Sequence, residues 1–340
     1  MILLVSPAGR RSVHGNGVTA RRWAGILGDL GHEVRIAPDY RTPGHPADVE
    51  DDGEWDHTRA GVDGHQALIA LHARKSAGAV RRFRAAHPGA PIVIALTGTD
   101  LYPDLASAGV DPAVLALAAR LIVLQPLGLA QLDPALRERA RVIIQSVPPI
   151  PKQPPRTDCF EVAFLAHVRP VKDPALPARA LRLLPAASKV CLTHAGEARD
   201  DGLAAQLAAE SASNPRYDWL GPRPREEALA LLARSRLMVL TSRHEGGANV
   251  ISEALAAGVP VISSAIAGSI GLLGADYPGY FPAGDAAALA ARLRAAELDR
   301  GGYYRELQAR CAALGPQVEP RKEKDAFAAL LAELALPAPA

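Results

Sequence analysis

The chain has 340 residues, and 49% of them are hydrophobic. This is enough for two domains with separate cores, because a single core rarely grows beyond about 300 residues. The 38 basic residues nearly balance the 36 acidic ones, which removes any global electrostatic case for nucleic acid or an anionic membrane as a partner. The first apolar run, Ile2–Val5, is too short for a signal peptide or a membrane span, so we expect a cytoplasmic protein.

The three cysteines, Cys159, Cys191 and Cys311, are isolated and odd in number. Their spacing matches neither a zinc site nor a disulfide framework, so we predict three free buried thiols. Nothing in the sequence indicates an oligomeric state.

In the first half of the chain, short apolar runs alternate with longer amphipathic stretches such as residues 18–30 and 76–87. This rhythm predicts parallel strands joined by crossover helices, which is a doubly wound α/β domain. The polar segment 43–64 has no apolar periodicity and is predicted to be a surface loop without a metal site, despite Asp51 and Asp52. The predicted strands cover residues 1–6, 32–37, 67–73, 91–98, 119–125 and 140–146.

Five prolines between Ser146 and Asp158 then interrupt the pattern. Proline removes backbone donors and prevents helix, so this segment is predicted to be an extended linker and a hinge. The rhythm restarts after the linker and ends in a helical stretch, residues 320–336, that we assign to the first domain. We therefore predict Rossmann-like domains at residues 1–150 and 151–319. The strands of the second domain are predicted at residues 161–168, 189–196, 217–221, 236–242 and 259–266.

Ligands of open α/β sheets bind beyond the carboxyl ends of the strands, so the strand-to-helix loops are the candidate sites. The first loop places a Gly-Asn-Gly run directly before a helix, where backbone N–H groups and the helix dipole attract an anion. An ordinary turn with an Asn or Thr cap is the alternative interpretation. The candidates for binding the donor anion are Gly15, Asn16 and Gly17, with Arg10, Arg11 and His14 close by in the sequence.

A second loop, after the predicted strand 161–168, carries Arg169 and Lys172 ahead of a helix that Asp173 and Pro174 are expected to start. Two cations beside a helix N-terminus suit a diphosphate. The alternative is that both side chains are solvated surface charges. Their position at the carboxyl end of a strand favours the diphosphate site.

The strongest signal follows the predicted strand 236–242, where Glu245 and Glu253 flank a Gly-Gly turn and a helix start. The turn can present bare amides, while Glu245 comes before the helix and Glu253 about two turns inside it. A carboxylate that accepts hydrogen bonds from two vicinal hydroxyls can hold a ring, so one Glu is predicted to meet a sugar and the other a ribose. The alternative makes Glu253 a solvated helix residue and Glu245 a partner of the helix dipole.

The segment EGGANVISEALAAGVPVISS resembles the donor-binding signature of the large retaining glycosyltransferase family of the GT-B fold, which is a Glu, seven residues and a second Glu. The preceding cationic loop resembles the diphosphate loop of that family, although Asp173 stands where the family commonly has Gly. The resemblance implies two doubly wound Rossmann-like domains facing a cleft, a nucleotide-diphosphate sugar as the donor and no cofactor. It implies sugar contacts for Glu245, ribose contacts for Glu253, diphosphate contacts for Arg169 and Lys172, and sugar or phosphate contacts for the amides of Gly246, Gly247, Ala248 and Asn249.

Three segments of the first domain, SPAGRRSVHGNGVTARRWAGILGDLGHEV, ALIALHARKSA and PIVIALTGTDLY, resemble the selenosugar synthases of selenoneine biosynthesis. That family couples selenophosphate to the anomeric carbon of a UDP-linked sugar. So small and anionic an acceptor needs a tight basic pocket, and an aromatic content of only 4% argues against a glycan groove. The resemblance implies an acceptor site made of Arg10, Arg11, His14, His72, Arg74, Lys75, Thr99 and Asp100.

The expected chemistry needs no general base, because the selenium of selenophosphate is already anionic. Thr97 stands where many family members have His, which fits this expectation. No Asp-x-Asp follows a predicted strand, so no metal is expected. The predicted catalytic residues are Glu245, Arg169, Lys172, His14 and His72.

Several alternatives stay open. The protein could be a transferase with an ordinary glycan or small-alcohol acceptor, a UDP-sugar epimerase, or a non-catalytic nucleotide-sugar binding protein. Among single residues, His72 has the alternative of a satisfied core histidine, Arg74 and Lys75 that of a solvated helix start, and Asp100 that of a turn cap.

Overall fold

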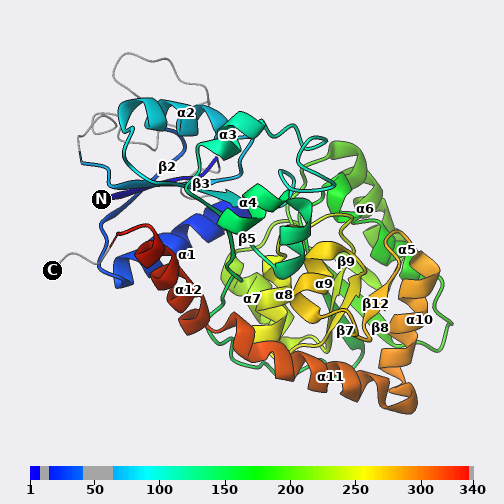
Figure 1. Cartoon of the computed structure of the whole chain (residues 1–340). Helices are drawn as coiled ribbons and strands as arrows, with labels where there is room; N and C mark the ends of the chain where they lie inside the picture. Colours follow the sequence, from blue (N-terminus) through cyan, green and yellow to red (C-terminus); the bar gives the residue numbers. More distant parts are fainter. Residues whose placement is uncertain (8–14, 41–63, 337–340) are drawn as a thin grey trace. The chain divides into compact units, whose positions relative to one another are not determined.

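The computed structural model describes residues 1–7, 15–40 and 64–336 of the chain (Figure 1). The chain divides into two compact units, one formed by Met1–Gln145 and Arg321–Ala340, the other by Ser146–Pro320. The division falls between Gln145 and Ser146, whereas the proline pattern indicated a boundary between residues 150 and 151. The predicted site residues Arg10, Arg11 and His14, and the segment 43–63 with Asp51 and Asp52, lie outside the described residues.

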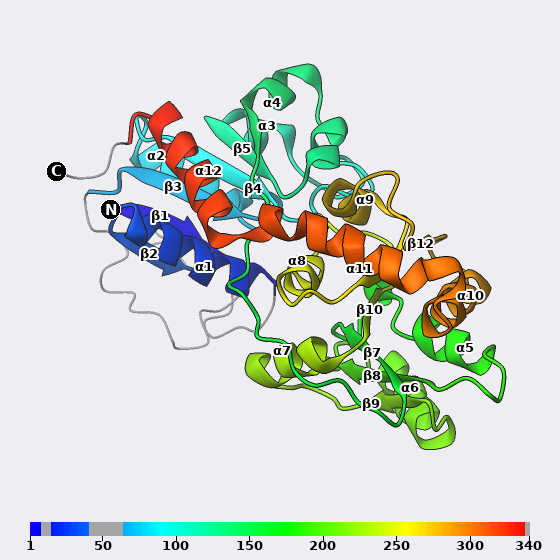
Figure 2. The ribbon, with the colours of Figure 1, turned by 90° about the horizontal axis from the view of Figure 1, so that it is seen from below.

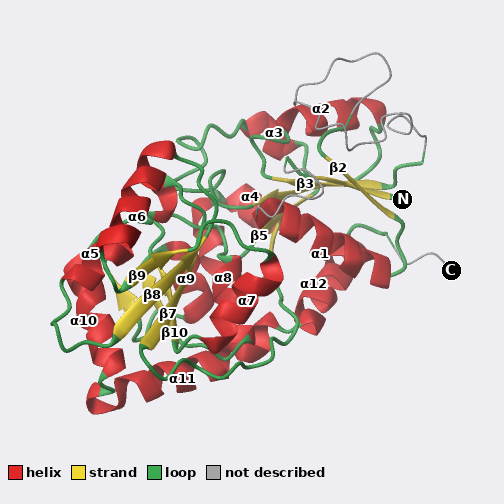
Figure 3. Ribbon diagram, turned by 180° about the vertical axis from the view of Figure 1, so that it is seen from behind, coloured by secondary structure: helices red, strands yellow, loops and turns green. Residues whose placement is uncertain are grey.

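The first unit is built on a parallel six-stranded sheet with the order β2-β1-β3-β4-β5-β6. Its helices lie on both faces, α1 and α12 on one and α2 and α3 on the other (Figures 1 and 3). The strands are β1 (Ile2–Val5), β2 (Val34–Ala37), β3 (Ala67–Leu71), β4 (Ile92–Leu96), β5 (Arg120–Val123) and β6 (Ala140–Val142), and the helices are α1 (Gly15–Asp29), α2 (Ala77–Ala86), α3 (Pro112–Ala116), α4 (Pro134–Arg139) and α12 (Pro320–Glu333).

Helix α12 packs beside α1 although the two come from opposite ends of the chain (Figure 2). The ring of Phe327 meets the ring of Trp23 edge to face, with 5.0 Å between their centroids. The buried carboxylate of Glu323 accepts hydrogen bonds from Trp23 Nε1 at 2.7 Å and from Arg22 Nε at 2.9 Å. These contacts make α12 part of the core of the first unit.

The second unit repeats this architecture with a parallel sheet of order β12-β11-β10-β7-β8-β9. Helices α7 and α8 lie on one side of the sheet and α5, α6 and α10 on the other (Figure 3). Its elements are β7 (Phe160–Leu165), α5 (Leu176–Arg182), β8 (Val190–Ala195), α6 (Asp201–Ser213), β9 (Tyr217–Trp219), α7 (Arg225–Arg234), β10 (Leu237–Leu240), α8 (Asn249–Ala256), β11 (Val261–Ser264), α9 (Ala267–Leu273), β12 (Tyr280–Phe281), α10 (Ala286–Glu297) and α11 (Tyr303–Leu314).

The predicted pair of doubly wound α/β domains is confirmed, and each predicted strand overlaps an observed one. Two local details differ from the prediction. The strand β12 was not predicted, because two residues are too short to show a pattern. Helix α5 begins at Leu176 with Ala175 at its N-cap, so Asp173 and Pro174 do not start it. Asp173 instead ends a short 3₁₀ helix, η3 (Pro170–Lys172), in the left-handed conformation with φ 44°.

The prediction of three free buried thiols is wrong for two of the cysteines. Cys159 and Cys191 form a disulfide, with 6.1 Å between their Cα atoms. Cys159 directly precedes β7 and Cys191 lies in β8, and the parallel pairing of these strands brings the two residues together. Only Cys311 is a free, buried thiol. The link depends on strand pairing, which the spacing of the cysteines does not show.

Candidate functional site

In the second sheet β7 and β10 are neighbours, and the loops that follow them meet. The Nζ atom of Lys172 donates a hydrogen bond to Oε1 of Glu245 and forms an ion pair with it. Ser242 donates a second hydrogen bond to the same oxygen, with 2.6 Å between Oγ and Oε1. The side chains of Lys172 and Glu245 are 26% and 13% exposed, so a ligand can reach both. The predicted phosphate-binding cation and the predicted sugar-binding carboxylate are therefore in contact.

Contacts with neighbouring residues hold both loops in place. The Oγ1 atom of Thr241 donates to the carbonyl oxygen of Lys172 at 2.8 Å. A Cβ atom on Gly268 would come within 2.3 Å of the carbonyl oxygen of Glu245, so only glycine lets α9 approach this loop so closely. Side chains on loops held in this way keep the geometry that a binding site needs.

Helix α8 begins directly after the loop of Glu245. Its N-cap residue is Ala248, whose side chain has no oxygen to cap the first turn, and the dipole of the helix favours an anion there. Glu253 is the fifth residue of α8, little more than one turn inside the helix and nearer its start than predicted. Only 9% of its side-chain surface is exposed, and its Oε1 atom lies 2.7 Å from Nη1 of Arg225. Glu253 is therefore not the solvated helix residue of the alternative interpretation.

Arg225 was not among the residues predicted from the sequence. It is the first residue of α7, which packs against α8 on the same side of the sheet. No local pattern connects it with Glu253, because the two residues lie on successive helices with β10 between them. The one sequence feature that could have indicated Arg225 is its position shortly after the carboxyl end of β9, since ligands bind at this edge of the sheet.

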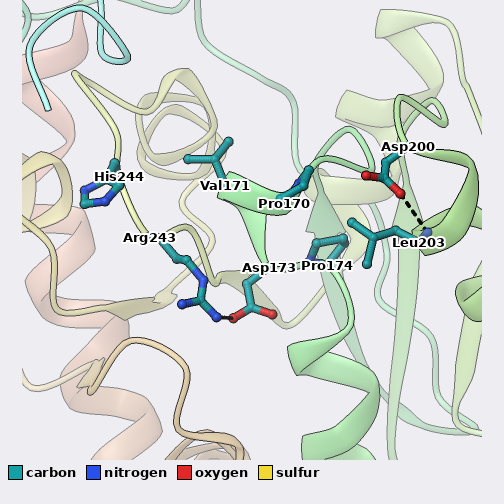
Figure 4. Close-up of a pocket in the computed structure, with 8 residues that line it drawn as sticks. All are labelled: Pro170, Val171, Asp173, Pro174, Asp200, Leu203, Arg243 and His244. Atoms are coloured by element: carbon teal, nitrogen blue, oxygen red, sulfur yellow. Dashed lines mark hydrogen bonds and ion pairs between the residues drawn. The ribbon is translucent and has the colours of Figure 1, made fainter. Parts of the chain in front are cut away.

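Next to these loops lies a pocket of ≈ 490 Å³ (Figure 4). Arg243 points across it to Asp173, with 2.9 Å between Nη2 and Oδ2, and its backbone N–H donates to the carbonyl oxygen of Val171 at 2.8 Å. Arg169 directly precedes η3 and is exposed. It is adjacent in the sequence to Pro170, which lines the pocket, but Arg169 itself does not line it. The lining residues are Pro170, Val171, Asp173, Pro174, Asp200, Leu203, Arg243 and His244.

In the first unit, β3 and β4 are neighbours, and their carboxyl ends carry the described part of the predicted acceptor site. His72 is buried and adopts a left-handed backbone conformation with φ 68°, which is uncommon for a residue with a side chain and typical of functional sites. Its Nε2 atom lies 3.0 Å from the hydroxyl of Thr99, which is exposed. The structure thus brings His72 and Thr99 together.

Burial lowers the pKa of His72 below its ordinary value of 6.5. The carboxylate of Asp100 opposes this shift, while the positive charges of Lys75 and Arg74 add to it. The imidazole is therefore neutral at pH 7, and it can either accept or donate one hydrogen bond at Nε2 according to its tautomer.

Asp100 is completely buried beneath these loops. Its carboxylate accepts hydrogen bonds from the backbone N–H groups of Ala73 at 2.8 Å, Thr97 at 2.9 Å and Gly98 at 2.8 Å. These bonds tie the loop after β3 to the loop after β4. The carboxylate is thus held by the backbone of both loops, and its predicted contact with the acceptor stays a prediction.

The remaining predicted residues of this unit lie at helix starts. Arg74 and Lys75 are exposed between β3 and α2. Helix α1 begins at Gly15, three residues before the predicted start, so Gly15, Asn16 and Gly17 form its first turn. Gly15 is exposed and Gly17 is buried. The role of this turn in donor binding stays a prediction.

Two other features are absent from the described ranges. Residues 1–7, 15–40 and 64–336 contain no group of three or more His, Cys, Asp or Glu side chains that could hold a metal ion. Among the helices of these same ranges, none has both the length and the apolar character needed to cross a bilayer.

The chain is similar to known proteins in both sequence and fold. Residues 149–317 match the family model of glycosyl transferases group 1. The D-inositol 3-phosphate glycosyltransferase of Mycolicibacterium paratuberculosis is 34% identical over 110 residues, which are 32% of this chain and 25% of that protein. The match thus spans about a quarter of the length of this curated relative.

Two solved structures share the fold over nearly the whole chain. Sucrose-phosphate synthase from Thermosynechococcus elongatus has a TM-score of 0.78 at 17% identity, covering 98% of both chains. Anabaena HepE in complex with UDP and glucose has a TM-score of 0.72 at 16% identity, covering 98% of this chain and 99% of its own. The two parallel six-stranded α/β units therefore have the GT-B fold. Residues 149–317 are thus similar to the group 1 family of glycosyltransferases.

Proposed function

We propose that this protein is a glycosyltransferase that takes the sugar from UDP-N-acetylglucosamine or UDP-glucose. The observation that carries the proposal is the contact of Lys172 and Ser242 with one oxygen of Glu245, inside the segment that matches the group 1 family. A cation and a carboxylate in contact suit a donor that joins a diphosphate to a sugar. HepE, which has the same fold, was solved with UDP and glucose, and this supports uracil as the base.

Each donor-binding residue then has a distinct task. Breaking the bond between the sugar and UDP leaves negative charge on the diphosphate, which Lys172 and Arg169 stabilise. Glu245 accepts hydrogen bonds from sugar hydroxyls while Lys172 and Ser242 fix its carboxylate. Glu253 accepts hydrogen bonds from the ribose. The amides at the start of α8 meet the distal phosphate or the sugar, namely those of Gly246, Gly247, Ala248 and Asn249.

For the acceptor we propose selenophosphate. The first-unit segments that resemble selenosugar synthases support this choice, together with the chemistry at the ends of β3 and β4. There, exposed Arg74, Lys75 and Thr99 surround a buried neutral His72, which suits a small anion better than a glycan. The selenium atom would form a bond to the anomeric carbon as the bond from that carbon to UDP breaks. Water would then cleave the bond between selenium and phosphorus, releasing phosphate and a selenol sugar.

An ordinary small-alcohol acceptor is the second candidate, and two observations favour it. The curated relative is named for transfer to D-inositol 3-phosphate, a phosphorylated alcohol. The neutral imidazole of His72, 3.0 Å from the hydroxyl of Thr99, is also a group that can take the proton an alcohol must lose. An anionic selenium nucleophile has no such proton, so the two acceptors differ in their need for His72.

One experiment tests donor and acceptor together. The purified protein is incubated with UDP-N-acetylglucosamine or UDP-glucose and either selenophosphate or inositol 3-phosphate, and UDP release and product mass are followed. A selenium-bearing sugar supports both parts of the proposal. A product formed only with the alcohol leaves the transferase intact and refutes selenophosphate. If no sugar nucleotide is consumed with any acceptor, the transferase proposal fails, and a changed sugar configuration without UDP release would indicate an epimerase.

A further inference from the structure

Glu253 and Arg225 form an ion pair, and the proposed donor site assigns a task only to Glu253. Their helices, α8 and α7, pack side by side. The guanidinium Nη1 atom of Arg225 lies 2.7 Å from Oε1 of Glu253. The side chain of Glu253 is 9% exposed and that of Arg225 is 42% exposed. The arginine therefore lies at the protein surface, and the carboxylate that it contacts lies beneath it.

A carboxylate withdrawn this far from water needs a compensating charge. Without one it adopts whichever rotamer solvates it best, or it takes up a proton. A guanidinium contact at 2.7 Å fixes the orientation of the carboxylate plane, since charge-assisted hydrogen bonds are strong and directional. An ionised carboxylate offers about four lone-pair sites, so an arginine and two ribose hydroxyls can be bound at once.

We propose that Arg225 is a positioning residue for the nucleotide: it holds the Glu253 carboxylate in the orientation that accepts the ribose hydroxyls. This inference rests on the proposed function, in which Glu253 binds the ribose of UDP. It adds a residue from the start of α7, and it makes selectivity for ribose over 2′-deoxyribose depend on a side chain that need not touch the sugar. The positive charge of Arg225 at the protein surface also attracts the anionic nucleotide.

The chain supplies a matched control two residues away. Arg223 has a side-chain exposure of 41%, almost that of Arg225, but its partner is the exposed Glu227 at 3.9 Å. Removing either arginine changes the net charge by the same amount. Of the two changes, only Arg225→Ala removes the guanidinium that contacts Glu253.

The test is calorimetric titration of the full-length protein with UDP and with 2′-deoxy-UDP. The variants are Arg225→Ala, Arg225→Lys and Arg223→Ala, and the thermal unfolding of each is recorded. We expect the wild type to bind UDP about tenfold more tightly than 2′-deoxy-UDP, the value of one hydrogen bond to a charged group. In Arg225→Ala, UDP should bind about tenfold more weakly and the preference for UDP should fall below about threefold. Arg225→Lys should restore part of the preference, and Arg223→Ala should keep the wild-type ratio.

A general loss of structure would weaken both nucleotides equally and leave the ratio between them unchanged, so the ratio reports positioning. If Arg225→Ala keeps the full preference for UDP, or binds UDP more tightly than the wild type, Arg225 does not position Glu253 and the inference is overturned. If the wild type itself binds no UDP, the proposed function fails and this inference fails with it.

Discussion

Lys172 and Glu245 are 73 positions apart in the sequence, yet they share an ion pair because β7 and β10 are adjacent parallel strands. Each lies on a loop at the carboxyl end of its strand. The pair therefore joins, at one edge of the sheet, a group that can neutralise a phosphate and a group that can hold a sugar. Because each side chain restrains the other, we expect the loss of either one to disturb both tasks.

Replacing Lys172 or Glu245 with Ala should lower kcat by about a hundredfold or more, since each change removes charge stabilisation that matters most as UDP departs. The measurement is steady-state release of UDP at saturating donor. Lys189→Ala is the control, because Lys189 is exposed at the opposite, amino end of β8. Wild-type rates in both site variants would refute the assignment of the donor site.

Replacing Ser242 with Ala removes the second hydrogen bond to Glu245 and leaves Lys172 in place. Ser242 is almost fully buried, so the change leaves the solvent-facing surface nearly unaltered. We expect about a tenfold loss in kcat/KM for the donor, the usual effect of losing a hydrogen bond to a charged group. Ser242→Thr should recover much of this loss if the hydroxyl is what matters. Equal losses in the Ala and Thr variants would indicate a packing defect instead.

Most of the strands could be predicted because they are buried on both faces and therefore form continuous apolar runs between polar or glycine-rich turns. The two loops with Lys172 and Glu245 could also be found, since the carboxyl ends of parallel strands are where ligands bind. That these two loops touch could not be predicted, because contact requires β10 to pair with β7.

The residues that sequence reasoning missed are those whose partners come from other elements. The disulfide between Cys159 and Cys191 depends on the pairing of β7 with β8, and Arg225 meets Glu253 through the packing of α7 on α8. The hydrogen-bond partners of Asp100 could not be predicted from the sequence either. The family resemblance implied that Asp100 contacts the acceptor, whereas its carboxylate accepts hydrogen bonds from three backbone N–H groups.

Stability should fall as the pH drops from 6.5 towards 4, in part because of His194. Burial lowers the pKa of this residue to about 4, while in the unfolded chain it titrates near 6.5. Between these values the unfolded state binds more protons than the folded state, so each proton favours unfolding. At pH 5 this amounts to about 2 kcal/mol.

The check is urea denaturation at pH 7.5 and pH 5.0 for the wild type, His194→Gln and a control at the exposed His244, His244→Gln. His194→Gln should be less stable at pH 7.5, because it disturbs the hydrogen bonds of His194 with Tyr217 and Ala166, both 2.7 Å long. It should also lose less stability than the wild type on acidification. A pH dependence equal to that of the wild type would contradict the role of His194.

Arg74 gives a test of the acceptor site that is independent of the donor. If the acceptor is an anion, Arg74→Ala should raise the acceptor KM about tenfold and leave the donor KM unchanged, because an exposed cation at the end of β3 contributes attraction more than chemistry. The control is Arg81→Ala, since Arg81 lies farther along the chain on α2, is half exposed and pairs with Asp111, the N-cap residue of α3. The effect at Arg74 should shrink as salt is raised from 50 to about 500 mM, because added ions screen exposed charges. A neutral alcohol acceptor would show neither the change in KM nor its salt dependence.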